Sequence, residues 1–90
     1  MPAHPVKHRH VRDELLADGR MVLFHPTSKR IVTLNPVAAL VWECCDGRHS
    51  EGAIVDEVCS VFTDTARVQE DVRVVLEDLR EKGLLEDDVR

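Results

Sequence analysis

The chain has 90 residues, of which 43% are apolar and 32% charged, and its formal net charge at pH 7 is −5. A chain of this length forms one small domain that buries roughly 60–65% of the surface exposed by the unfolded chain, which argues against a large active site. The apolar content is too high for a disordered chain. The sequence shows neither an apolar run of about 20 residues, as a membrane span needs, nor the apolar segment of a secretory signal. We therefore expect a cytoplasmic protein that has no membrane partner.

The first third of the chain predicts a flexible arm and then three strands. Residues 1–10 hold two prolines and three histidines without a usable period, so we expect this arm to be frayed or extended. Asp18 and Gly19 suit a two-residue hairpin turn, because both tolerate the positive φ that such a turn requires. Pro26 presets φ for a second turn. The expected strands of the resulting antiparallel meander are Val11–Leu16, Met21–His25 and Arg30–Leu34.

The pair Asn35 and Pro36 marks the change from strand to helix. The Asn35 side chain can accept a hydrogen bond from a free N–H group of the first helical turn. Proline suits the first helical position, because it has no N–H group to leave unsatisfied. The helix is expected to run to about Cys45, where Asp46 and Gly47 provide a stop.

Two further helices complete the predicted domain. Ser50 can cap the second helix, whose apolar residues from Ile54 to Phe62 recur mostly every three or four positions. The third helix is expected to begin at Asp64 or Thr65 and to end where Gly83 takes a left-handed conformation. Its apolar residues show the clearest helical period in the chain: Val68, Val72, Val75, Leu76 and Leu79.

These elements predict an α+β fold, in which a three-stranded antiparallel β-meander is followed by three α-helices on one side of the sheet. The arrangement is winged-helix-like, because a winged-helix domain uses the same parts. The expected organisation is a flexible arm over residues 1–10, a single domain over residues 11–86 and a tail over residues 87–90.

Cysteines and histidines are the first candidates for a metal or redox site. Cys44 and Cys45 are adjacent and Cys59 stands alone, so neither the C-x₂-C spacing of a zinc site nor a redox C-x-x-C motif is present. We expect the three cysteines and Trp42 to be core residues. The histidines are interpreted as solvated, and we expect no metal or cofactor. The serines lack the local pattern of an activated nucleophile, so catalysis is not expected.

The charge distribution argues against a nucleic acid as partner. Residues 46–90 contain 13 Asp and Glu against 6 Lys and Arg, a net charge of −7, while residues 1–45 contain 4 against 6, a net charge of +2. The third helix carries several acidic residues between Glu70 and Glu81, so it would be repelled by phosphate groups. A winged-helix DNA-binding regulator and a general protein-interaction module remain the alternative functions.

Three segments together resemble the PqqD family of peptide chaperones, which recognise ribosomally synthesised and post-translationally modified peptides. The first segment, LNPVAALVWECCDGRHS, begins at Leu34 and combines a capped helix start with an Asp-Gly turn. The second segment is IVDEV from Ile54, and the third is VLEDLREKGLL from Val75. The order and spacing of these segments carry the resemblance, which covers about residues 11–85.

The resemblance implies a non-catalytic chaperone that binds the leader segment of a precursor peptide and presents it to a modifying enzyme. That enzyme would be a radical S-adenosylmethionine (SAM) enzyme, a leader peptidase or a cyclase. The leader would be added as a strand to the third strand, whose free edge can template it. The sequence does not determine which face of that strand points into the groove. The expected peptide-binding residues are Arg30, Ile31, Val32, Thr33 and Leu34 on the strand, and Asp71, Val75, Asp78, Leu79 and Lys82 on the third helix and at its end.

Overall fold

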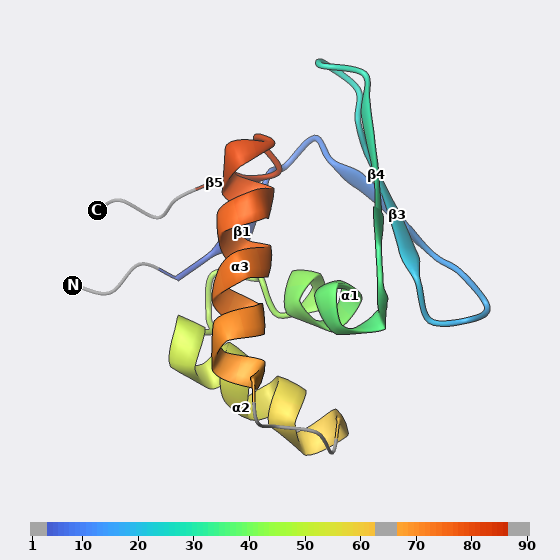
Figure 1. The fold of residues 1–90 in the computed structure, drawn as a ribbon. Coiled ribbons are helices and arrows are strands. Elements are labelled where there is room, and N and C mark those ends of the chain that lie inside the picture. Colours follow the sequence, from blue (N-terminus) through green and yellow to red (C-terminus); the bar gives the residue numbers. More distant parts are fainter. Residues whose placement is uncertain (1–3, 63–66, 87–90) are drawn as a thin grey trace.

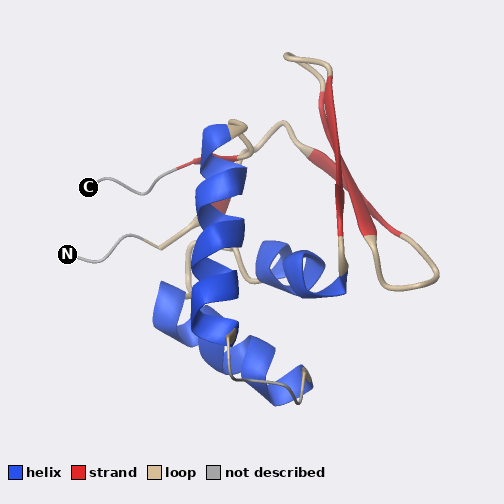
Figure 2. Cartoon of the chain, viewed as in Figure 1, coloured by secondary structure: helices blue, strands red, loops and turns tan. Residues whose placement is uncertain are grey.

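The computed structural model describes residues 4–62 and 67–86, in which a three-stranded sheet lies to one side of three helices (Figure 1). This arrangement confirms the predicted α+β fold. Helix α1 lies between the sheet and α3, and the strands of the larger sheet are grouped at one side of the molecule (Figure 2). The elements in chain order are β1 (Val6–Lys7), β2 (Arg12–Leu15), β3 (Met21–His25), β4 (Arg30–Leu34), α1 (Pro36–Glu43), α2 (Glu51–Val61), α3 (Val68–Glu81) and β5 (Leu85–Glu86).

The larger sheet has the strand order β2-β3-β4, and β3 pairs antiparallel with both neighbours. The predicted bounds of β3 and β4 are confirmed, whereas β2 is shorter than expected. The predicted two-residue turn is wrong, because a three-residue loop joins β2 to β3. The N–H of Leu16 donates to the carbonyl of Arg20 at 2.7 Å, and the N–H of Gly19 donates to the carbonyl of Leu16 at 3.1 Å. Gly19 has a φ of 92°, as the left-handed last residue of such a loop requires.

The predicted capping residues begin α1 and α2. The Asn35 Oδ1 accepts a hydrogen bond from the N–H of Ala38 at 2.8 Å, and the Ser50 Oγ accepts one from the N–H of Ala53 at 3.1 Å. Pro36 is the first residue of α1, as predicted. Each cap satisfies a backbone donor that the first helical turn leaves free, so the start of both helices is determined locally.

Helix α3 packs one face against the rest of the domain, which confirms its predicted period. Its end is closed by Gly83, which has a φ of 74°, and by a hydrogen bond of 3.0 Å from the N–H of Leu84 to the carbonyl of Leu79. The predicted start of this helix, at Asp64 or Thr65, lies outside the described residues. The buried residues of α3 are Val68, Val72, Leu76 and Leu79.

The core between the sheet and the helices contains the tryptophan and two of the cysteines. Trp42 is fully buried, and its Nε1–H donates to the Asp13 Oδ2 at 2.8 Å, a bond between α1 and β2 that the sequence did not predict. Cys44 and Cys45 are buried in the same core, as predicted, and Cys59 is half-buried against it. These residues therefore hold the fold together.

Residues 4–10 of the expected arm are extended and pack against the domain. Strand β1 pairs antiparallel with β5 in a second, two-stranded sheet. The N–H of Lys7 donates to the carbonyl of Cys45 at 2.9 Å, and Pro5 is fully buried. A two-residue strand has no period, so the local sequence did not indicate this pairing with a segment at the other end of the chain. The tail expected over residues 87–90 lies outside the described residues.

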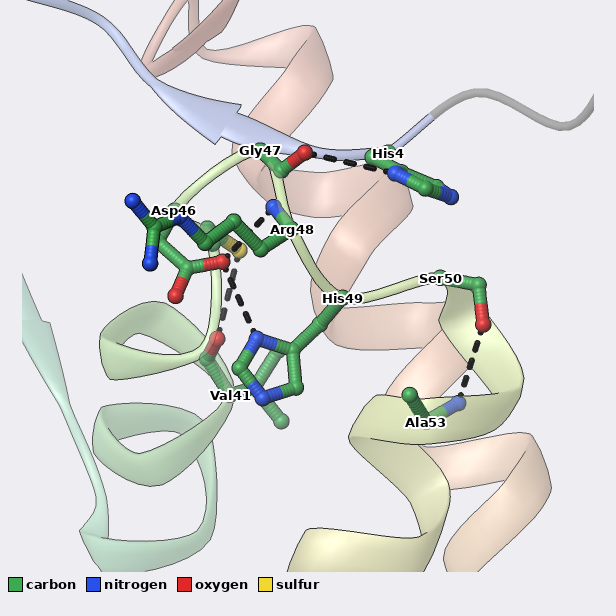
Figure 3. A network of polar contacts seen from close by, with 9 residues as sticks. His4, Val41, Asp46, Gly47, Arg48, His49, Ser50 and Ala53 are labelled. Atoms are coloured by element: carbon green, nitrogen blue, oxygen red, sulfur yellow. Dashed lines mark hydrogen bonds and ion pairs between the residues drawn. The ribbon is translucent and has the colours of Figure 1, made fainter.

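The turn between α1 and α2 is organised by polar contacts around Asp46 (Figure 3). The Asp46 Oδ1 lies 3.0 Å from the Nδ1 of His49 and accepts a hydrogen bond from the N–H of Arg48 at 2.8 Å. The contact with His49 and then the Arg48 N–H lower the pKa of Asp46 to about 2. Gly47 has a φ of 80°, and its carbonyl lies 3.2 Å from the Nδ1 of His4 (Figure 3). The predicted stop therefore shapes this turn, although α1 itself ends earlier.

Candidate functional site

Strand β4 forms one edge of the larger sheet, as the sequence predicts for Arg30–Leu34. Successive residues of an antiparallel strand direct their N–H and C=O groups toward opposite sides. The bond from the Leu16 N–H to the Arg20 carbonyl, which closes the first hairpin, fixes which residues of β3 bond to β2 and which bond to β4. The strand register then places the bonds between β3 and β4 at Val32 and Leu34. The N–H and C=O groups of Ile31 and Thr33 therefore point away from the sheet. They form a free edge to which another strand can be added.

The burial pattern of β4 determines which face points toward the helices. Leu34 is 5% exposed, and Val32 is half-buried and packs against the core. Ile31, in contrast, is 67% exposed, and Thr33 is exposed as well. The inward-facing side chains are therefore Val32 and Leu34, which resolves the alternation that the sequence left open.

A hollow of about 250 Å³ lies between β4 and α3. Its lining also includes three residues that the sequence did not predict, namely Asn35, Ala38 and Val74. Asn35 and Ala38 form the cap of α1, and this local role concealed their position beside the hollow. Val74 is 56% exposed and does not belong to the apolar period of α3. An exposed apolar side chain on an otherwise polar helix face is a signal that this position contacts a ligand or partner. The predicted site residues that line the hollow are Val32, Thr33, Leu34, Val75, Asp78, Leu79 and Lys82.

A second hollow, of about 410 Å³, continues along α3 toward the N-terminal end of the helix. It shares Asn35, Val74 and Val75 with the first hollow, so the two adjoin, and together they are named the β4–α3 groove below. Asp71 lines the second part of this groove. Arg30 and Ile31 line neither part. The structure therefore brings together eight of the ten predicted side chains.

Charged side chains stand at both ends of the β4–α3 groove. At one end, the Lys82 Nζ lies 2.8 Å from the Asp78 Oδ2, and both side chains are half-buried. The ammonium group offsets the charge of Asp78, so this carboxylate attracts a basic ligand less than the sequence alone suggested. At the other end, the lining contains one cation, Arg67, and two carboxylates, Glu70 and Asp71. The second end therefore carries the larger negative charge.

The cysteines and histidines take other roles. Burial raises the pKa of the Cys45 thiol to about 12 and also raises the pKa of Cys44, so both are neutral at pH 7. In residues 4–62 and 67–86, no three His, Cys, Asp or Glu side chains are grouped so that they could hold a metal ion. His8 packs against His10 and His25, with ring centroids 5.4 and 4.7 Å apart. None of the helices in these residues has the length and apolar character of a membrane span.

Helix α3 would be the recognition helix if the domain bound DNA as a winged helix does. Its exposed residues include four carboxylates and two arginines, a net charge of −2. Because neutralised phosphates supply most of the affinity for DNA, such a surface is unsuited to that role. The DNA-binding alternative has no support in the structure. The exposed charged residues of α3 are Glu70, Asp71, Glu77 and Glu81 against Arg73 and Arg80.

Comparison with known families agrees with the geometry. The model of the family described as coenzyme PQQ synthesis protein D, PqqD, matches residues 20–85, which is more than half of the chain. The chain belongs to the PqqD family. A protein of Rhodopseudomonas palustris strain TIE-1 named PqqA binding protein is 33% identical over 87 residues, which are 92% of this PqqD-family chain and 81% of the relative. Its namesake in strain BisB5 is 34% identical over 67 residues, which are 73% of the chain and 64% of that relative, just under two thirds of its length.

Two solved structures have the same fold as this PqqD-family protein. The structure of TbiB1 in complex with the TbiA(beta) leader peptide has a TM-score of 0.77 and 27% identity, and the match covers 90% of this chain and 94% of TbiB1. A lasso peptide synthetase B1 complexed with the leader peptide has a TM-score of 0.76 and 20% identity, covering 92% of this chain and 98% of that protein. At 20% identity the second likeness concerns the fold alone.

Proposed function

We propose that this PqqD-family protein binds the leader segment of a ribosomally synthesised precursor peptide in the β4–α3 groove. The leader adds as a strand to the free edge of β4, and its side chains contact α3. The observation that carries this proposal is a free strand edge beside a hollow with an apolar floor. The names of the relatives, as a PqqA binding protein and as a complex with a leader peptide, support it. The protein itself catalyses no reaction.

Strand addition determines which parts of the leader are recognised. The outward N–H and C=O groups of Ile31 and Thr33 bond to the leader backbone, which gives affinity without regard to sequence. Every second side chain of the added strand lies on the inner face, beside Val32 and Leu34. Two leader residues at positions i and i+2 therefore enter the groove, where apolar side chains contact Val75. These two positions give the apolar part of the specificity.

The length and charge of the groove define the rest of the recognised segment. Helix α3 has 14 residues, so it spans about 21 Å, and an extended peptide covers this length with about six residues. Leader residues near Arg67, Glu70 and Asp71 meet an excess of one carboxylate, which favours a basic or amide side chain. The pair of Asp78 and Lys82 has no net charge, so it selects the leader less strongly by charge.

Presentation to a modifying enzyme completes the proposed function. A leader held by its backbone in one extended conformation increases the effective concentration of the rest of the precursor near an enzyme that binds the chaperone. The enzyme is a radical SAM enzyme, a leader peptidase or a cyclase, as the family resemblance implies. The cytoplasm, where the precursor is made, is the expected compartment. Neither nucleic acid nor a metal or cofactor takes part.

An amide-shift titration of the isotope-labelled protein tests the site. The ligand is a synthetic leader segment of the cognate precursor peptide. We expect shifts in β4 and in α3 from Asp71 to Lys82, because strand addition changes the backbone of one wall and the side-chain contacts of the other. Val75→Lys should abolish these shifts by filling the groove with a charge. Glu77→Lys, which places the same charge on an exposed position of α3 outside the groove, is the control. Shifts confined to the β2–β3 hairpin or to α2 would contradict the proposal.

A further inference from the structure

Another hollow, separate from the β4–α3 groove, lies at the opposite edge of the same sheet. It has a volume of about 330 Å³ and is enclosed by β2, the loop after it, α1 and the end of α2. Its lining shares no residue with either part of the β4–α3 groove. The hollow is named the β2–α1 groove below. Its principal apolar residues are Leu15, Met21, Pro36, Leu40, Val61 and Phe62.

The β2–α1 groove collects exposed apolar side chains. Among the described residues, four large hydrophobic side chains are strongly exposed, and two of them, Leu15 at 65% and Val61 at 60%, line this groove. A third, Val74, lines the β4–α3 groove, where the proposed function gives it a ligand. Exposed apolar side chains gathered in a hollow mark an interaction surface. The β2–α1 groove therefore has the character of a docking site without an assigned ligand.

The backbone of β2 adds a second feature of a docking site. Strand β2 is the other edge of the sheet, and all four of its residues are exposed. The bond between Leu16 and Arg20 places the bonds to β3 at Arg12 and Glu14, so the N–H and C=O groups of Asp13 and Leu15 point outward. The side chains of Asp13 and Leu15 line the groove. An extended segment could therefore bond to the edge and place every second side chain in the hollow.

The charge of the β2–α1 groove restricts its occupant. The charged residues of its lining are Asp13 and Glu43, and no cation is among the described residues that line it. The Asp13 carboxylate accepts a hydrogen bond from the neutral indole of Trp42, which leaves its charge in place. The Glu43 carboxylate lies 3.6 Å from the Lys7 Nζ, which offsets part of its charge, so Asp13 carries the larger uncompensated charge of the lining. A second copy of this chain would bring the same carboxylates together, whereas a segment with lysine or arginine beside apolar residues would complement them.

We propose that the β2–α1 groove docks an extended segment of the modifying enzyme whose inward-facing residues, every second one along the segment, include both apolar and basic side chains. This inference rests on the proposed function, because it assumes that an enzyme receives the leader. The enzyme segment and the leader then occupy opposite edges of one sheet. Adjacent strands are about 4.8 Å apart, so four spacings separate the two added strands by about 19 Å. The chaperone can therefore bind both at the same time and hold them at a fixed distance.

A model peptide tests the groove without knowledge of the enzyme. The probe is a blocked six-residue peptide whose inward-facing residues are leucine, lysine and leucine, with serine at the positions between them, and its counterpart with glutamate in place of lysine is the matched control. We expect the lysine peptide to shift amide signals of β2, α1 and the end of α2, and the glutamate peptide to bind at least tenfold more weakly. The double variant Leu15→Asn, Val61→Asn should lose the shifts, and Glu14→Gln, on the outer face of β2, should keep them. Shifts in the β4–α3 groove alone would overturn the inference.

The cognate modifying enzyme provides the second test. The double variant should bind this enzyme at least tenfold more weakly than the unaltered protein does, while its affinity for the leader stays the same. Equal enzyme binding by both proteins would overturn the inference and leave the proposed function intact. Loss of leader binding by Val75→Lys is read separately and tests the proposed function alone. Concentration-dependent dimers that disappear in the double variant would show that a second copy covers the groove, which would also overturn the inference.

Discussion

The two edges of the larger sheet offer the same backbone groups but lie beside different helices. The edge at β4 faces α3, and its groove is lined by charged residues of both signs at its two ends. The edge at β2 faces α1 and the end of α2, and its groove is apolar with two carboxylates. Because backbone bonding is nearly independent of sequence, the bordering helix decides what each edge selects. Under the two proposals, one small sheet binds two partners of different chemistry.

Proline substitution at each edge gives the largest expected effect. Thr33→Pro removes an outward donor and should weaken leader binding by about tenfold to a hundredfold, since a lost hydrogen bond with an unpaired acceptor costs about 1–3 kcal/mol. Leu15→Pro makes the same change at the other edge and should leave leader affinity unchanged. Calorimetric titration with the leader measures both. Equal losses in the two variants would mean that the edges are not independent.

The bond between Trp42 and Asp13 ties only the β2 edge to α1, and removing its acceptor should have the next largest effect. Asp13→Ala leaves the buried indole N–H without its partner, so the free energy of unfolding should fall by about 1–2 kcal/mol. Glu14→Ala, on the outer face of the same strand, should change it by less than about 0.5 kcal/mol. Urea denaturation followed by fluorescence is specific, because the chain has one tryptophan. Identical curves for the two variants would contradict the role of this bond.

Two glycine substitutions compare the helices that border the two grooves. Gly83→Ala forces a Cβ into the left-handed residue that ends α3, which should lower the free energy of unfolding by about 1 kcal/mol. Gly52→Ala in α2 adds a better helix former, whose Cβ would meet the Ser50 Oγ at an ordinary contact distance of 3.9 Å, and should raise that free energy by about 0.5 kcal/mol. Thermal melts of the two variants should therefore shift in opposite directions. A stabilised Gly83→Ala variant would contradict the positive φ at that position.

The smallest expected effect is on the pH dependence of stability, and it concerns Asp46, which lies outside both grooves. The pKa of Asp46 is lowered in the folded state to about 2. Its contribution to the free energy of unfolding is therefore fully present above the pKa of the unfolded state and is lost as the pH falls toward 2. Asp46→Asn should therefore flatten the loss of stability between about pH 4 and pH 2. Leader affinity at neutral pH should not change. A variant whose acid denaturation curve follows that of the unaltered protein would show that this carboxylate contributes nothing.

Much of the fold could be predicted because its determinants are local. The caps at Asn35 and Ser50, the left-handed Gly83 and the period of α3 each depend on residues within one or two turns. The first hairpin loop was predicted one residue too short, since Asp18 and Gly19 suit more than one loop length. The pairing of β1 with β5 was missed, because its partners lie at opposite ends of the sequence.

The sequence by itself determined the order of the three strands β2–β4 and the three helices, the charge of the helical half and the strand that forms the proposed peptide-binding edge. These properties follow from the identity and spacing of neighbouring residues. Only the tertiary structure decided that Val32 and Leu34 face inward and that Asn35, Ala38 and Val74 line the β4–α3 groove. The same structure alone created the β2–α1 groove, whose residues come from four separate elements and loops. The physical reason is that a groove depends on how helices pack against a sheet, and that packing is set by long-range contacts which no local pattern contains.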